Sequence, residues 1–436
     1  MIKMHKVEYP LLDETVYYEK MQNGLQVILI PKPGFAKTYG IITTDFGSID
    51  NHFVPLQSDS EIVVPDGVAH FLEHKLFEGE KHDAFDDFSK LGSSANAFTS
   101  FTRTSYLFSA TSKVDENIET LLDFVQEPYF TEEGTEKEKG IIAQEIQMYE
   151  DNPDWRLFYG LLKNMYPKHP LSIDIAGTVD SIQAITPEIL QTCYDTFYHP
   201  SNMNLVIIGN FPVEETMVVI RNNQDAKEFA KEEHILRFIP SETISDLTAH
   251  DEIEMDVKRP KLIMGVKGLT TQLEGNESDN YYLKGSLLME MLFGRGSDNF
   301  NTLYDNGVLD DSFNYSFTID RSFNFMALEV DTNEPEQVIK EWKNILLNWK
   351  NDSSFTAENF NLLKRAFIGE QLQAFNSLEY ISNQYGYLYA AGIEMFNRIE
   401  RLETLTLEDI AAFAEHYINE QIISTFIVKP KKGSNV

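Results

Sequence analysis

Cysteine is nearly absent from this sequence, since Cys193 is the one cysteine in 436 residues. A disulfide within the chain is therefore impossible, and a cysteine-rich zinc site is excluded. Basic residues are also scarce: 36 Lys and Arg stand against 69 Asp and Glu, and the formal net charge is −33. Such a charge keeps a protein soluble and makes nucleic acid and anionic membranes poor partners, whereas basic peptides would be attracted.

Long apolar runs are missing as well. No stretch approaches the roughly 20 apolar residues of a membrane-spanning helix. The N-terminal segment has no apolar run after Lys3 and Lys6, so it does not read as a signal peptide. We therefore expect a soluble cytoplasmic protein with no membrane span.

Length and composition predict two globular domains. A chain of 436 residues is too long for a single ordinary hydrophobic core, and 42% hydrophobic residues are enough to form two cores. A polar stretch runs from Asn222 to about His250. We expect an N-terminal zinc-binding catalytic domain at 1–222, a linker at 223–250 and a homologous C-terminal domain without a metal site at 251–436.

Local patterns mix strands and helices in both halves without strict alternation. Strand patterns lie at 25–31, 39–46, 96–101, 104–110, 204–209, 261–266, 313–318, 323–330 and 422–428, and helix patterns at 66–79, 83–91, 114–125, 135–149, 154–165, 187–197, 213–222, 280–293, 335–349, 356–374 and 377–391. This mixture predicts an α+β fold with two similar halves, each a mostly antiparallel sheet packed with helices.

The segment 66–79 carries the strongest chemical signal. We expect Asp66 to cap a short helix and Gly79 to end it. His70 and His74 are four residues apart, so both imidazoles leave one face of this helix, with Glu73 on the same edge. Two imidazoles one turn apart suit a zinc ion, and a neighbouring carboxylate can act as general base. The pattern is H-x-x-E-H, the inverse of the H-E-x-x-H zinc peptidase motif; the alternative is an amphipathic helix with two surface histidines.

Two histidines do not complete a zinc site, because catalytic zinc normally takes three protein ligands. Glu145 lies on a separate acidic helix, 71 residues after His74, and is a candidate for the third ligand. A solvated carboxylate is the alternative for any single Glu in that stretch. Glu138 shares its face two turns earlier.

With these motifs the chain resembles the inverzincin peptidases, the family of pitrilysin, insulin-degrading enzyme (insulinase) and the mitochondrial processing peptidase, and most of all its short bacterial zinc-bearing members. In that family a helix with two glutamates seven apart follows the H-x-x-E-H motif, and the second glutamate binds zinc. The resemblance implies one Zn²⁺ per chain held by His70, His74 and Glu145. It makes Glu73 the general base and Glu138 a supporting carboxylate.

Further segments extend the resemblance through residues 20–215. Ser93–Thr99, with Thr104 and Tyr106, is similar to the family's substrate-facing edge strand, and Tyr198–Gly209 matches a later landmark. The implied substrate-binding residues are Asn96, Ala97, Phe98 and Thr99. The implied activity is zinc-dependent cleavage of small extended peptides, and the alternative is a non-catalytic peptide-binding or scaffold subunit of the same fold.

The sequence departs from the family in its second half. An Arg and a Tyr seven apart usually follow a Gly-rich turn there and hold the substrate carbonyl. Here Tyr304 and Asp311 occupy those positions, and Arg295 or Tyr315 could substitute only through a shift in register. We therefore expect a heterodimer with a homologous subunit that carries the missing Arg/Tyr pair; a homodimer is the alternative.

Overall fold

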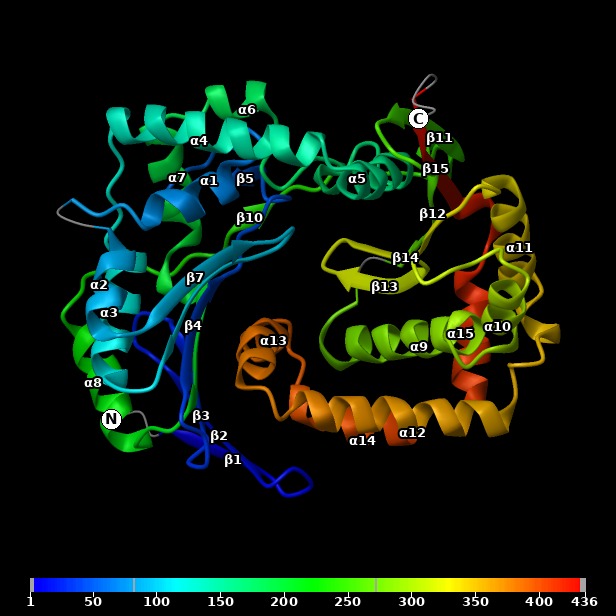
Figure 1. The fold of residues 1–436 in the computed structure, drawn as a ribbon. Helices are drawn as coiled ribbons and strands as arrows, with labels where there is room; N and C mark the ends of the chain where they lie inside the picture. The colour runs from blue at the N-terminus through cyan, green and yellow to red at the C-terminus, as the bar shows by residue number, and fades with distance from the viewer. Residues whose placement is uncertain (1–3, 81–82, 271–272, 432–436) are drawn as a thin grey trace. The chain divides into compact units, whose positions relative to one another are not determined.

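The computed structural model describes residues 4–80, 83–270 and 273–431 (Figure 1). The chain forms two compact units. The first contains Met1–Ile146, Asp174–Phe238 and Gln373–Phe396, and the second contains Gln147–Ile173, Ile239–Leu372 and Asn397–Val436. Each unit is thus assembled from separated stretches of the chain. The domain limits expected at 222 and 251 stay a prediction.

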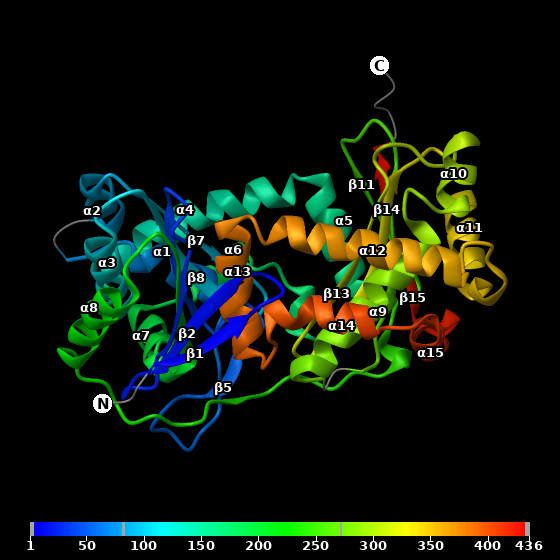
Figure 2. The same cartoon turned by 90° about the horizontal axis from the view of Figure 1, so that it is seen from below.

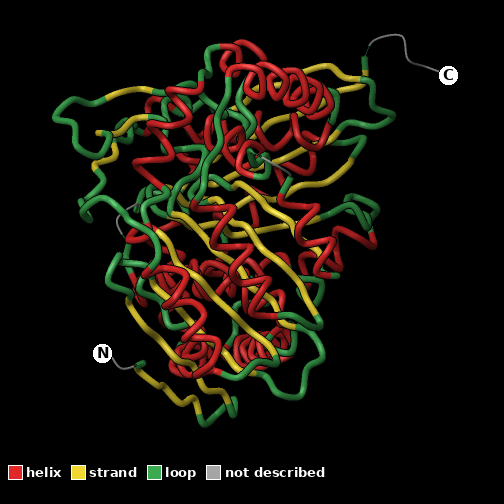
Figure 3. The backbone as a smooth tube through the Cα atoms, turned by 90° about the vertical axis from the view of Figure 1, so that its left-hand side faces the viewer, coloured by secondary structure: helices red, strands yellow, loops and turns green. Residues whose placement is uncertain are grey.

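The first unit is built on a seven-stranded sheet with the order β1-β2-β3-β9-β4-β8-β7. Its strands are β1 (His5–Tyr9), β2 (Glu14–Lys20), β3 (Gln26–Pro31), β4 (Thr38–Thr44), β7 (Ser94–Thr99), β8 (Thr104–Ala110) and β9 (Met203–Gly209). All neighbours are antiparallel except β3 and β9. Figure 3 shows these strands running side by side. β9 is buried along its whole length, as its apolar run requires at the centre of a sheet.

Helices cover both faces of this sheet. They are α1 (Val68–Leu76), α2 (Ala84–Leu91), α3 (Val114–Gln126), α6 (Val179–Gln183), α7 (Pro187–Phe197), α8 (Val213–Asp225) and α13 (Leu378–Ala390). α4 (Glu132–Glu150) begins in this unit and ends in the second. Figures 1 and 2 show α13 on the sheet face opposite α3 and α8. A small sheet of β10 (Leu236–Arg237), β5 (His52–Val54) and β6 (Ile62–Val63) completes the unit.

The second unit has a five-stranded sheet with the order β11-β15-β12-β14-β13. Its strands are β11 (His250–Met255), β12 (Lys261–Lys267), β13 (Asn314–Asp320), β14 (Phe323–Asp331) and β15 (Ile423–Pro430), and its helices are α5 (Pro153–Met165), α9 (Gly275–Phe293), α10 (Asp298–Asp305), α11 (Pro335–Leu347), α12 (Ala357–Ala374), α14 (Arg398–Thr404) and α15 (Leu407–Tyr417). Only the β11–β15 pair is parallel. Each unit has its own apolar core.

The α+β architecture expected from the sequence is confirmed, with one mostly antiparallel sheet and packed helices in each half. The predicted elements appear with shifts of a few residues at their ends. The edge strands β1 and β11 and the neighbouring strand β2 were not predicted, because their alternation of charged and apolar residues is weak. Among the helices of the described residues, none combines the length and apolarity that a bilayer crossing needs.

Candidate metal centre

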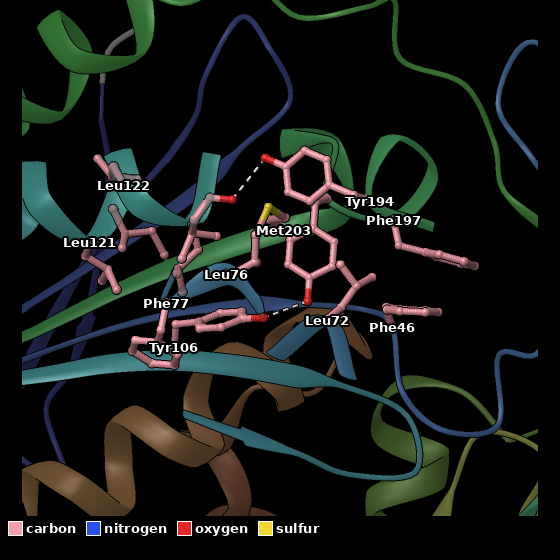
Figure 4. Packing of buried hydrophobic residues seen from close by; sticks show 14 of the residues in the cluster. Phe46, Leu72, Leu76, Phe77, Tyr106, Leu121, Leu122, Tyr194, Phe197 and Met203 are labelled. Carbon is pink, nitrogen blue, oxygen red and sulfur yellow. Dashed lines mark hydrogen bonds between the residues drawn. The ribbon is translucent and has the colours of Figure 1, made fainter. Parts of the chain in front are cut away.

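Helix α1 carries the two histidines on one side and packs its apolar side into the core. Val68, Ala69, Leu72 and Leu76 are buried in the first unit's core, which holds one side of the helix against the sheet. Figure 4 shows Leu72 and Leu76 among the aromatic side chains of that core. The opposite side carries His70 and His74, whose ring centroids are 4.6 Å apart. Burial of the apolar side therefore fixes the direction of both imidazoles.

The expected ends of α1 were wrong. Gly67, not Asp66, is the N-cap residue, and no side chain caps the helix. Gly67 has φ 89°, and a Cβ on it would lie 2.4 Å from the carbonyl oxygen of Ala176. A close backbone approach therefore sets the start, and Asp66 accepts a hydrogen bond from the Asn51 amide instead. The helix ends with Phe77 as its C-cap, before Gly79.

Helix α4 brings two carboxylates to these histidines. Glu145 Oε1 lies 3.7 Å from His70 Nε2, and Glu145 Oε2 lies 3.6 Å from His74 Nε2. One donor atom from each of these three residues lies within 4.8 Å of the other two. Glu138, two turns earlier on α4, places Oε1 2.8 Å from His74 Nδ1. The structure thus brings together the four residues that the spacing singled out on two helices.

The three donor atoms fit a zinc ion. Zinc bonds imidazole nitrogen and carboxylate oxygen at about 2.0–2.2 Å, so ligand atoms in a tetrahedral site lie about 3.3–3.6 Å apart. Each histidine Nε2 lies close to this distance from one oxygen of the Glu145 carboxylate, Oε1 for His70 and Oε2 for His74, so the carboxylate faces both imidazoles. Three protein ligands leave a fourth position open, as in catalytic zinc sites. The contact from Glu138 to His74 Nδ1 is the outer hydrogen bond that metal-bound histidines commonly make, and it directs Nε2 toward the centre.

The pKa values of the two histidines shift in opposite directions. Burial and the neighbouring His74 lower the pKa of His70 to about 3, so His70 is neutral near pH 7. Burial also acts to lower the pKa of His74, but the hydrogen bond and charge of Glu138, with Glu73 and Glu145, raise it overall. Within the described residues, His70 Nδ1 is buried without a hydrogen-bond partner. Glu138 therefore supports one histidine of the pair.

Glu73 lies between the histidines in sequence and is 9% exposed. Burial raises the pKa of its carboxyl, while a hydrogen bond from Thr99 acts in the opposite direction. Thr99 Oγ1 donates to Glu73 Oε2 at 2.5 Å. The sequence gives no sign of this contact, because 26 residues separate the two. A raised pKa with a fixed orientation suits a carboxylate that must accept and return a proton.

The predicted substrate residues Asn96, Ala97, Phe98 and Thr99 all lie on β7, the outermost strand of its sheet. β8 pairs with one edge of β7, and the other edge has no partner strand among the described residues. Side chains alternate between the faces of a strand, so Thr99 and Ala97 share the side of α1 and Phe98 has the other side. The free edge of β7 therefore lies on a strand that packs against the histidine-bearing helix α1.

The positions of the absent Arg/Tyr pair lie in the second unit. Tyr304, on α10, is 42% exposed, and its hydroxyl is 3.5 Å from Asp311 Oδ1. Arg295 is also near Asp311, at 4.0 Å, and Tyr315 donates a hydrogen bond to Glu290. Arg295 and Tyr315, the two possible replacements, thus do not occupy the sequence positions of the family's Arg/Tyr pair.

Comparison with known proteins agrees with this geometry. The insulinase model (peptidase family M16) matches residues 58–179, and the model described as the peptidase M16 inactive domain matches residues 184–367. The "uncharacterized zinc protease YmfH" of Bacillus subtilis (strain 168) is 48% identical over 425 residues, which cover 98% of this chain and 99% of that protein.

Solved structures show the same fold. An M16-like peptidase from Alicyclobacillus acidocaldarius superposes with a TM-score of 0.93 at 34% identity, over 98% of this chain and 100% of that one. A protease from Helicobacter pylori superposes with a TM-score of 0.77 at 18% identity, over 99% and 100% of the two chains. The chain is 48% identical to a named zinc protease over 98% of its length, and both family models match it. The chain therefore belongs to the insulinase family, peptidase family M16.

Proposed function

We propose that this chain is a zinc-dependent endopeptidase that cleaves small extended peptides. The observation that carries this proposal is the convergence of His70, His74 and Glu145, with donor atoms within 4.8 Å of one another, beside the half-buried edge of β7. We assign these three side chains as ligands of one Zn²⁺ and Glu138 as the support of His74. A zinc ion held there supplies Lewis acidity to the scissile carbonyl and to the attacking water.

Glu73 is the proposed general base. Its carboxylate takes a proton from the attacking water as the oxygen–carbon bond forms, and returns that proton to the leaving amine as the carbon–nitrogen bond breaks. Its low exposure keeps bulk water from competing for the proton. The carboxylate is regenerated at the end of each cycle.

The substrate is proposed to bind along β7, between Asn96 and Thr99. Backbone hydrogen bonds to a free strand edge give affinity with little demand on sequence, and they require an extended peptide. The net charge of −33 favours basic peptides through long-range attraction. The cytoplasmic location expected from the sequence stays a prediction.

The partner is proposed to be a homologous subunit that supplies an Arg and a Tyr to the substrate carbonyl, in a heterodimer. This proposal is supported by the residues at the two positions, which are Tyr304 where the family has Arg and Asp311 where it has Tyr. The chain therefore supplies neither the cation nor the phenol at its expected position. A homodimer is the alternative. Size measurement of the purified chain, alone and mixed with a homologue that carries the pair, separates the two states.

The test of the activity is zinc content together with peptide hydrolysis, measured for the wild type, Glu73→Gln and the surface control Glu80→Gln. Glu73→Gln should keep one zinc and lose cleavage by about 10²–10⁴-fold, the usual range for a general base. Glu80→Gln should match the wild type. Unchanged cleavage in Glu73→Gln would remove Glu73 as the base, and zinc without cleavage, alone and with the partner, would favour the scaffold alternative.

A further inference from the structure

The last residue of the edge strand β7 contacts the metal helix through its side chain. Thr99 Oγ1 donates to Glu73 Oε2 at 2.5 Å, and both residues belong to the first unit. Thr99 is the end of β7, and Glu73 is in the middle of α1. The strand proposed to receive the peptide is thereby joined to the proposed base by a single hydrogen bond.

The hydroxyl hydrogens around Thr99 can be assigned. Thr104, opposite Thr99 on β8, donates its hydroxyl hydrogen to the carbonyl oxygen of Phe46 at 2.9 Å. Thr104 Oγ1 is 3.4 Å from Thr99 Oγ1, a much longer contact than the 2.5 Å to Glu73. A hydroxyl has one hydrogen to give. The hydrogen of Thr99 therefore belongs to Glu73, and the hydrogen of Thr104 is used on the backbone.

We infer that Thr99 is a positioning residue for the general base: its hydroxyl fixes Glu73 by Oε2 and leaves Oε1 to exchange the proton with water and with the leaving amine. The inference rests on the proposed peptidase function for the role of Glu73. The Oγ1–H···Oε2 bond stays intact throughout the cycle, so one oxygen of the carboxylate is an anchor and the other does the proton transfer. Since the Thr99 side chain contacts Glu73 and not the free strand edge, its loss should affect turnover and not peptide affinity.

Two variants of Thr99 separate the hydroxyl from the shape of the side chain. Thr99→Val keeps the branched shape that suits a strand and removes the hydroxyl, whereas Thr99→Ser keeps the hydroxyl and removes the methyl group. Thr43→Val is the matched control. Thr43 is a buried threonine of the same sheet, and its hydroxyl is hydrogen-bonded to Ser105 Oγ at 2.9 Å. Thr43→Val removes a comparable hydroxyl without touching Glu73.

The kinetic test uses the zinc-loaded full chain and an unstructured peptide. Thr99→Val should lower kcat by about 10–100-fold, the worth of a hydrogen bond to a charged group, with KM changed by less than about threefold. Thr99→Ser should recover most of the wild-type kcat. Thr43→Val should lower the thermal midpoint of unfolding as Thr99→Val does, and keep kcat. All three should retain one zinc, because no ligand has changed.

A structural readout makes the inference independent of activity. In crystal structures of the zinc-loaded variants, the Glu73 carboxylate should take a different rotamer in Thr99→Val and the wild-type rotamer in Thr99→Ser. An unmoved carboxylate in Thr99→Val overturns the inference, even if the wild type proves to have no peptidase activity. Active wild type with an unchanged kcat in Thr99→Val also overturns it, and leaves the peptidase proposal standing.

Discussion

The sharpest prediction concerns Glu138, which should set the zinc affinity of the centre without being a ligand. Its Oε1 lies 2.8 Å from His74 Nδ1, and the Glu138 side chain is 13% exposed. A hydrogen bond to a charged group at such a site contributes about 1.5–3 kcal/mol. Glu138→Ala loses all of this and should weaken zinc binding by about 10–100-fold.

Glu138→Gln gives an intermediate case. A glutamine keeps a carbonyl oxygen that can accept the hydrogen bond from Nδ1–H and loses only the charge. Charge-assisted hydrogen bonds are roughly twice as strong as neutral ones, so about half of the free energy should remain. The zinc dissociation constant should rise by about 3- to 10-fold, between the wild type and Glu138→Ala.

Competition with a chromophoric chelator at fixed pH measures this series. Glu136→Gln is the matched control, because Glu136 lies on the same helix, is 56% exposed and pairs with Lys139, away from the histidines. Its zinc affinity should equal that of the wild type. If Glu138→Ala binds zinc as tightly as Glu136→Gln, the hydrogen bond to His74 does not support the ligand, and the reasoning fails.

Three further predictions concern pH dependence, two glycines of α4 and a buried aspartate of the second unit. Glu138 helps to raise the pKa of His74 above 6.5, so the pair stabilises the metal-free fold fully below pH 6.5 and loses this effect as the pH rises through the raised pKa. Zinc must displace the His74 proton, so calorimetry should show zinc affinity falling in acid, and falling less steeply for Glu138→Ala. Gly134→Ala should lower the thermal midpoint of unfolding by several degrees, since its Cβ would lie 2.6 Å from the buried Lys75 Nζ, whereas Gly140→Ala on the same helix, with nothing within 4 Å, should raise stability by about 0.5–1 kcal/mol. Asp279→Ala should destabilise the second unit by about 3–5 kcal/mol, because it removes the buried carboxylate that contacts both Arg398 and Arg401, and should leave zinc affinity unchanged.

The histidine-bearing face of α1 could be predicted because it follows from local spacing. The i, i+4 histidines and the buried apolar residues between them specify both the helix and the side that carries the imidazoles. The same holds for Glu138 and Glu145, whose separation of seven puts them on one face of α4. The start of α1 could not be predicted, because the close approach of Gly67 to the backbone of Ala176 joins segments more than 100 residues apart.

The fold class was likewise readable, but its pairings were not. The parallel contact of β3 with β9 joins Gln26 to Asn204, and the periodicity of either strand is the same whatever its neighbour. A local sequence pattern also does not show which sheet a helix packs against. Residues 377–391 read as a helix in sequence, but only the structure shows α13 packed on β4 and β9 of the first unit.

The packing of α13 shows how a distant segment becomes part of the unit that carries the proposed metal centre. Gly386 lies so close to β9 that a Cβ on it would be 2.0 Å from Asn204 Oδ1, so any larger residue here would have to displace the buried Asn204 side chain. Beside it, the Tyr385 hydroxyl is hydrogen-bonded to that of Tyr18 at 2.5 Å. Two residues after Tyr385, the Tyr387 ring lies 4.2 Å from the guanidinium of Arg103, in the turn between β7 and β8. The turn that follows Thr99 therefore contacts a residue almost 300 positions later in the chain, and no local pattern in the sequence predicts that contact.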